Sequence, residues 1–124
     1  MAYDEFLADR ARQVLKQKSI HFEEKKMIGG LCFMIDGKMC FGLDTDKKTD
    51  APRLMCRVGD LNYEKALQRP HCGEMDFTGR VMKGYVYISA EGIDTDKELD
   101  YWIQLCLDFN PLAKSSKKKK SKKK

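Results

Sequence analysis

Residues 31–43 constrain the fold most, because an Asp-Gly pair divides them into two strand-like runs. Both residues of Asp36-Gly37 accept the positive φ angles that a two-residue hairpin turn requires. This turn predicts an antiparallel pair of strands, residues 31–35 and 38–43. The predicted register has three cross-strand pairs: Ile35 with Lys38, Phe33 with Cys40, and Cys32 with Phe41.

Both faces of this hairpin are largely apolar. One predicted face carries Leu31, Phe33, Ile35 and Cys40, and the other carries Cys32, Met34, Met39 and Phe41. Cys32 and Cys40 are thus expected on opposite faces, which argues against a disulfide between them. A small domain rarely covers both faces of a sheet alone, so we expect a second copy to bury one face in a homodimer.

Helical patterns surround the predicted hairpin. Asp4 begins an amphipathic helix that ends near Lys18, and its expected apolar face is Phe6, Leu7, Ala11, Val14 and Leu15. A short helix is predicted between residues 61 and 69, stopped by Pro70. Thr95 and Glu98 form a capping box for a last helix, which ends before Pro111 and has the apolar face Leu99, Trp102, Ile103, Cys106 and Leu107.

The remaining segments complete the predicted order α, β, β, β, α, β, β, α. Residues 53–58 and 82–89 are predicted strands, residues 20–27 are either a charged strand or a connector, and residues 75–80 form a loop that leads into a strand. The connections are mostly too short for parallel crossovers. The sequence therefore predicts an α+β domain in two layers, with an antiparallel sheet and helices packed on one face.

Charge divides the chain into two parts. The net charge is +5, but residues 114–124 contain eight of the 24 basic side chains and no acidic one. The other 16 basic side chains face 19 acidic ones, so the first 113 residues carry about −3. We expect a folded domain at 1–113 and a disordered lysine-rich tail at 114–124. No signal peptide or membrane span is recognisable, and the five cysteines lie in apolar runs, so we expect a cytoplasmic, reduced protein.

The sequence contains little that indicates catalysis. His71-Cys72 is a candidate for half of a metal site, but the paired short spacings of zinc sites are missing. His21 stands alone among charged residues. Cys72 is the only candidate nucleophile, and an inert loop thiol is the favoured interpretation. We therefore expect no metal, no cofactor and no enzymatic activity.

Two interpretations of the glycine-containing turns stay open. Gly29-Gly30 and Thr78-Gly79-Arg80 present backbone N–H groups that suit an anion, with Arg80 and Lys83 nearby. The favoured alternative is that the glycines permit tight turns and that Asp76 pairs with Arg80 or caps the turn. If the domain has a functional surface, we expect it to be lined by Lys25, Lys26, Arg57, Arg80 and Lys83.

Three motifs together resemble the N-terminal domain of the TfoX/Sxy family, from about Tyr3 to Phe109. They are Lys25-Lys26-Met27-x-Gly29-Gly30-Leu31, Arg57-Val58, and the segment 75–85. The residues that carry the resemblance as structural motifs are Gly29, Gly30, Asp76, Phe77, Gly79, Gly84 and Tyr85.

The resemblance implies a secretion-chaperone-like two-layer fold, often a dimer, and a regulatory role. Full-length members of that family regulate competence genes for DNA uptake, with the cyclic-AMP receptor protein. Ile28 stands where many members have phenylalanine. The chain ends after the matched domain, so the second, helix-hairpin-helix-like domain of full-length regulators is not expected.

Two functions from different classes follow as hypotheses. The first is a non-enzymatic regulatory or interaction domain that engages transcription machinery or nucleic acid. The alternative is a small-molecule or anion-binding domain, conceivably an enzyme, that uses the region of Arg80 and Lys83. The tail either attracts nucleic acid without sequence specificity or only solubilises the chain; its lysines are Lys114 and the run Lys117, Lys118, Lys119, Lys120, Lys122, Lys123 and Lys124.

Overall fold

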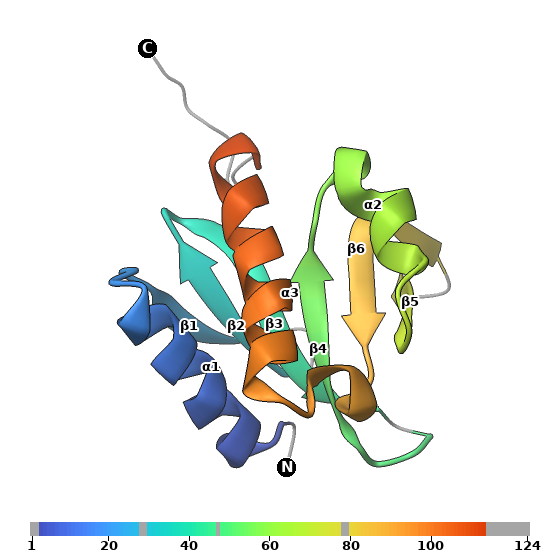
Figure 1. Cartoon of the computed structure of the whole chain (residues 1–124), viewed down its shortest axis with the longest axis horizontal. Helices are drawn as coiled ribbons and strands as arrows, with labels where there is room; N and C mark the ends of the chain where they lie inside the picture. The colour runs from blue at the N-terminus through green and yellow to red at the C-terminus, as the bar shows by residue number, and fades with distance from the viewer. Residues whose placement is uncertain (1–2, 28–29, 47, 78–79, 114–124) are drawn as a thin grey trace.

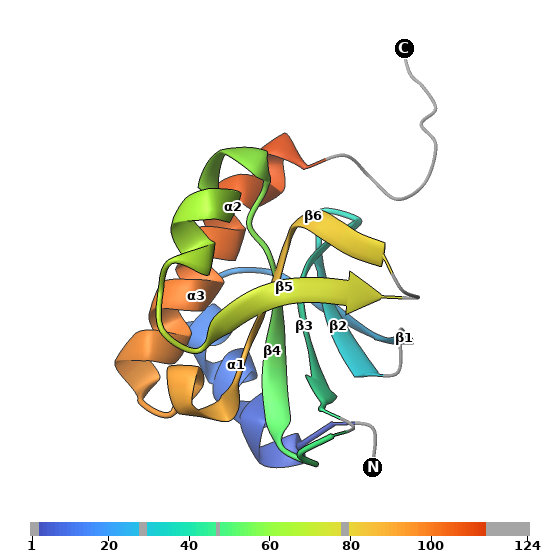
Figure 2. The same cartoon turned by 90° about the vertical axis from the view of Figure 1, so that its right-hand side faces the viewer.

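A computed structural model describes residues 3–27, 30–46, 48–77 and 80–113 of the chain. In these residues the helices form one layer and the sheet forms the other, as the side view of Figure 2 shows. The elements, labelled in Figure 1, are α1 (Glu5–Gln17), β1 (Glu23–Met27), β2 (Gly30–Ile35), β3 (Lys38–Thr45), β4 (Pro52–Arg57), α2 (Asp60–Leu67), β5 (Cys72–Phe77), β6 (Arg80–Ile88) and α3 (Asp96–Phe109), with short 3₁₀ turns at Ala90–Ile93 and Asn110–Leu112.

The strands form a single antiparallel sheet with the order β1-β2-β3-β4-β6-β5. The predicted α+β class and the predicted alternation of helices and strands are confirmed. The structure has one more strand before α2 than the predicted order. Residues 20–27, predicted to be either a charged strand or a connector, contain β1, which pairs with β2. The predicted loop at residues 75–80 is instead mostly strand, since β5 runs to Phe77 and pairs with β6 from Arg80 onward.

The first helix begins where the sequence predicted. The carboxylate of Asp4 accepts a hydrogen bond from the backbone N–H of Phe6 at 2.9 Å, which satisfies one of the free N–H groups of the first turn. Its buried face is Leu7, Ala8, Ala11, Val14 and Leu15. The prediction for Phe6 was wrong: the residue is 72% exposed, because the buried stripe extends from Leu7 toward Ala8 and Ala11, whereas Phe6 lies about 100° from Leu7 on the other side.

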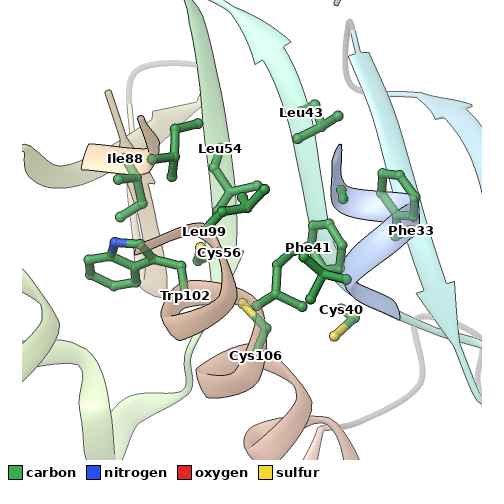
Figure 3. Packing of buried hydrophobic residues seen from close by; sticks show 14 of the residues in the cluster. Phe33, Cys40, Phe41, Leu43, Leu54, Cys56, Ile88, Leu99, Trp102 and Cys106 are labelled. Carbon is green, nitrogen blue, oxygen red and sulfur yellow. The ribbon is translucent and has the colours of Figure 1, made fainter. Parts of the chain in front are cut away.

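The last helix supplies the centre of the core. The hydroxyl of Thr95 accepts a hydrogen bond from the backbone N–H of Glu98 at 3.1 Å, as the capping motif predicted. From this start, α3 directs Leu99, Trp102 and Cys106 toward the sheet, where they belong to one buried cluster with side chains of β2, β3, β4 and β6 (Figure 3). Spacing of three and four residues keeps these side chains on one face of the helix.

A β-bulge changes the predicted register of the β2–β3 hairpin. Ile35 pairs with Lys38 as the Asp-Gly turn predicted, but the register shifts between Phe33 and Met34. Phe33 therefore faces Phe41 rather than Cys40, and the two rings stack with centroids 4.7 Å apart. The prediction that Phe41 lies on the face of Cys32 was wrong, because the extra residue of the bulge turns Phe41 toward the helices. Cys32 and Cys40 do lie on opposite faces.

The face of the sheet away from the helices is covered at its centre within the single chain. Cys32, Met34 and Met39 form a second small cluster there, and Tyr85 of β6 packs against it. Each of the three is at most 8% exposed. The reason given for a homodimer, a bare apolar face that needs a second copy, is therefore wrong for these residues. The dimer itself stays a prediction.

One ion pair joins β3 and β4 in a partly buried position. The guanidinium of Arg53 donates two hydrogen bonds to the buried carboxylate of Asp44, at 2.8 and 3.2 Å. It also lies 3.5 Å from the ring centroid of Tyr87 in β6. A buried carboxylate is tolerated when it is paired and hydrogen-bonded in this way. The contact stabilises the part of the sheet where β3, β4 and β6 meet.

Candidate functional site

A groove of about 480 Å³ lies where β4 ends, α2 begins and α3 ends. Figures 1 and 2 show the start of α2 and the end of α3 at the same end of the molecule. Three segments line it: residues 57–62, residues 83–85 of β6, and residues 108, 109 and 112. We call it the Arg57 groove.

The backbone between β4 and α2 explains why the groove forms here. The carbonyl of Gly84 accepts hydrogen bonds from the N–H groups of Val58, at 2.8 Å, and Gly59, at 3.0 Å. Gly59 has φ 84° and ψ 165°, a conformation that is essentially restricted to glycine. A side chain at this position would overlap the ring of Phe109. Glycine therefore lets the chain turn sharply into α2 and lets the Phe109 ring lie against the backbone.

Arg57 forms the polar part of the groove. Its guanidinium lies 5.6 Å from the Tyr85 ring centroid and 5.8 Å from that of Phe109, within cation–π range. Its Nη1 also donates to the carbonyl of Met39 at 3.4 Å, so the group is held in place. A positioned guanidinium between aromatic rings is suited to a carboxylate or another planar acceptor.

The charges that line the groove balance within the described residues. Arg57 and Lys83 contribute two positive charges, and Asp60 and Asp108 contribute two negative ones. Lys83, Asp60 and Asp108 are exposed to solvent. The groove itself therefore does not favour a ligand of either sign by net charge.

The apolar part of the groove lies at its rim. Leu61 is 92% exposed and Leu112 is 70% exposed, and both line the groove beside the half-buried Phe109. Large apolar side chains that stand together around a concave surface are typical of binding sites. The Arg57 groove thus combines an exposed apolar rim with a held guanidinium.

The five predicted surface cations are not all brought together. Arg57 and Lys83 line the same groove. Lys25 and Lys26 lie in β1 at the far edge of the sheet, separated from β4 by β2 and β3. The side chain of Arg80 is outside the described part of the structure.

The structure describes only some of the residues predicted to form the structural motifs and the lysine-rich tail. Gly30 has a structural explanation, because a side chain there would overlap the carbonyl oxygen of Leu43 in the neighbouring strand. Gly84 and Tyr85 line the groove. Outside the described residues lie Gly29, Gly79 and the tail lysines Lys117, Lys118, Lys119, Lys120, Lys122, Lys123 and Lys124, together with the side chains of Asp76 and Phe77.

Cys72 does not have the environment of a nucleophile. It begins β5, where its backbone pairs with Ile88, so it is not the loop thiol that the sequence predicted. Burial raises its pKa from the usual 9.0 to about 11, which keeps the thiol protonated at neutral pH. Activated cysteines show the opposite shift. Among the residues that the structure describes, no three side chains of His, Cys, Asp or Glu gather where they would hold a metal ion.

The sequence missed most of the groove. Of its lining residues, the sequence predicted only Arg57 and Lys83 as binding residues and Gly84 and Tyr85 as structural motif residues. It predicted no functional role for Phe109 or for the two exposed leucines, Leu61 and Leu112. Leu61 begins the predicted short helix, but the buried residues of that helix are Tyr63 and Ala66. Gly59 was the available signal, since a glycine directly before a helix often marks a special backbone conformation.

The fold and the groove define a small α+β domain with a candidate binding surface, and comparison with known proteins identifies its family. The TfoX N-terminal domain model matches residues 15–110. The match covers most of the chain, which therefore belongs to the TfoX N-terminal domain family. No curated protein and no solved structure matches the chain. Among the described helices, none has both the length and the hydrophobicity to cross a membrane.

Proposed function

We propose that this chain is a non-enzymatic, cytoplasmic regulatory domain that binds a protein partner of the transcription machinery through the Arg57 groove. The observation that carries the proposal is the pair of exposed leucines, Leu61 and Leu112, on the rim of a concave surface. Most of the groove falls inside the matched range, residues 15–110, and Leu112 lies two residues beyond it. The regulatory part of the proposal comes from the family.

Burial of the rim contributes part of the free energy that a specific contact needs. Each leucine that passes from water into an interface contributes about 1.5–3 kcal/mol. Tyr85 and Arg57, beside the rim, belong to the residue types that dominate binding energy in interfaces. A partner that covers Leu61, Leu112 and the Phe109 ring at once therefore binds through a compact apolar centre with polar groups around it.

The environment of the thiols supports the non-enzymatic part. Burial raises the pKa of Cys32 to about 11, as it does for Cys72, and raises the pKa of Cys106 well above its usual value. These thiols are thus stabilised as neutral, packed groups. Among the described residues that line the groove, none is a histidine or a cysteine.

Gene deletion with complementation tests the proposal in the native cell. Deletion is expected to change a defined set of transcripts, and the wild-type gene is expected to restore them. A double variant, Leu61→Lys with Leu112→Lys, is expected to accumulate normally but fail to restore them. Phe6→Lys is the matched control, because Phe6 is about as exposed as Leu112 but lies in α1, outside the groove. Full restoration by the double variant, or unchanged transcripts after deletion, refutes the proposal.

An anion-binding function is the second candidate, because Arg57 and Lys83 line the same groove, although Asp60 and Asp108 balance their charge. The volume of about 480 Å³ is within the range of small-molecule sites. A thermal-shift screen with nucleotides and phosphorylated metabolites tests it. Stabilisation that Lys83→Ala abolishes and Lys97→Ala retains supports this function, because Lys97 is an exposed lysine of α3 outside the groove. No stabilisation across the panel counts against it.

Homodimerisation is a further part of the proposal that the family resemblance supports. One chain has a mass of 14.3 kDa. Light scattering coupled to size exclusion is expected to show twice this mass at high concentration. A single species of the monomer mass at all concentrations refutes the dimer.

A further inference from the structure

We propose that a second copy of this chain occupies the Arg57 groove, seated so that each copy fills the groove of the other across a two-fold axis. The inference rests on the proposed function, because it names the interface of the proposed homodimer and a regulation of the same site. A groove filled by a second copy is closed to the transcription partner. Three features of the described residues carry the inference: the place of the exposed leucines, the shape of the surface beside them, and the mixed charges of the groove.

The exposed apolar residues favour the groove over the sheet as the place of self-association. Among the residues that the structure describes, the large hydrophobic ones that stay exposed are Phe6, Leu61 and Leu112. The two leucines lie together on the rim of the groove, whereas Phe6 lies apart in α1. The apolar cluster on the face of the sheet away from the helices is already covered within one chain. A second copy therefore has more apolar surface to cover at the groove than at that cluster.

The rim and the groove complement each other in shape. Leu61 is 92% exposed at the start of α2, so its own chain covers almost none of it, and it stands beside a concave surface of about 480 Å³. In a two-fold contact, the surface that one copy offers is offered back by the other. A single arrangement therefore places Leu61 of each copy in the groove of the other, where Leu112 and the Phe109 ring leave water together with it.

The charges of the groove suit a second copy better than a ligand of one sign. Two cations, Arg57 and Lys83, and two carboxylates, Asp60 and Asp108, line it. A phosphate or an anionic lipid surface would meet the carboxylates together with the cations, so it gains no net attraction. A second copy presents the same four charges, and the two-fold contact sets cations of one copy opposite carboxylates of the other. Charge complementarity therefore favours self-association at this surface.

The contact is expected to be weak and to depend on concentration. Its apolar centre, the rim leucines and the Phe109 ring of each copy, is small beside the larger and more hydrophobic interfaces of permanent dimers. A weak contact lets the second copy and the transcription partner compete for the same leucines. The dimer therefore withholds the groove at high concentration of the chain, and dilution releases it.

Sedimentation equilibrium of the full chain, from about 1 μM to about 1 mM, measures self-association over the range of weak complexes. We expect Leu61→Ser with Leu112→Ser to raise the dissociation constant of the dimer at least about tenfold, and Phe6→Ser to change it less than about twofold. All three residues are exposed, so the fold is expected to be preserved, and the midpoint of urea unfolding checks this for each variant. A double leucine variant that dimerises as the wild type does overturns the proposal.

Charge reversal tests whether the occupant is a second copy. Starting from two charges of each sign, Lys83→Glu leaves the groove with one positive and three negative charges, and Asp108→Lys leaves it with three positive and one negative. Each variant alone is expected to self-associate at least about tenfold more weakly at low salt, because like charges meet across the axis. An equimolar mixture is expected to recover dimers with one copy of each variant, detected by native mass spectrometry. Lys97→Glu is the matched control, since Lys97 is exposed in α3 outside the groove, and it is expected to dimerise as the wild type does.

The remaining outcomes separate the inference from the proposed function. Absence of mixed dimers, or equal weakening by Lys97→Glu, overturns the inference, as does a bound lipid or peptide that the purified wild type carries and the double leucine variant loses. A monomer at all concentrations overturns the inference together with the proposed homodimer. Any of these results, combined with transcripts that still require the two leucines, leaves partner binding at the groove intact. Mixed dimers combined with unchanged transcripts after gene deletion refute the regulatory function alone.

Discussion

Gly59→Ala is the substitution for which the structure predicts the sharpest effect. Gly59 joins β4 to α2 with φ 84° and ψ 165°, and a methyl group there would overlap Cε1 and Cδ1 of Phe109. The substitution therefore acts twice: it strains the backbone, and it moves the ring that forms one wall of the groove.

The magnitude follows from these two effects. A non-glycine residue in this backbone region costs about 1–3 kcal/mol. Overpacking against a neighbouring ring costs about 1–3 kcal/mol more. The free energy of unfolding should thus fall by about 2–6 kcal/mol, against a total of about 5–15 kcal/mol for a domain of this kind. With an m-value of about 1.5 kcal/mol per molar urea, the midpoint of unfolding moves down by roughly 1.3–4 M.

Urea unfolding followed by circular dichroism measures this shift. Gly73→Ala is the matched control, because its added methyl group would meet no atom within 4 Å and Gly73 has no positive φ. We expect the control to stay within about 0.5 kcal/mol of the wild type. A Gly59→Ala midpoint equal to that of the wild type, or an equal fall for both variants, would refute the reasoning.

Three further predictions concern the ion pair, a cap and a thiol. Asp44→Asn leaves Arg53 partly buried beside a weaker acceptor and should lower the free energy of unfolding, measured in urea, by about 1–3 kcal/mol. Asp9→Asn, in an exposed ion pair, should lower it by less than about 0.5 kcal/mol. Equal losses in the two variants contradict this prediction. Thr95→Ala removes the N-cap of α3 and should lower the free energy of unfolding by about 1 kcal/mol, whereas Thr95→Ser, which keeps the capping hydroxyl, should retain the stability of the wild type. Cys72 should react slowly with iodoacetamide at pH 7 and faster as pH rises toward its pKa of about 11, because only the thiolate reacts; labelling at neutral pH as fast as a free thiol peptide contradicts this.

Local signals in the sequence predicted local structure well. Asp36-Gly37 predicted the hairpin turn, and Thr95 predicted the start of α3, because each depends on a few adjacent residues. The pairing of Phe33 with Phe41 was not predictable in this way. It depends on a bulge, and the alternation of residues along the two strands does not reveal where an extra residue is inserted.

The groove was not predictable from local patterns, because its residues come from three separated segments. Arg57 and Lys83 were selected as cations, but only the strand order brings β4 beside β6 and places them together. The exposure of Leu61 depends on which face α2 presents to the sheet. In a helix of eight residues the pattern of apolar side chains is too short to decide this.

The strand order has a consequence for how the domain folds. β1 to β4 pair in chain order, whereas β4 next pairs with β6, so residues 54–57 meet residues 85–88 across a long separation in the chain. Strand pairs between residues distant in the chain are expected to form late in folding, because the segment between them loses conformational entropy before the new contacts compensate for it. The groove is lined by residues from both β4 and β6, the two strands that this pairing joins. A chain that has folded only its first four strands therefore lacks the part of the groove that residues 83–85 form, so the groove is complete only after β4 has paired with β6.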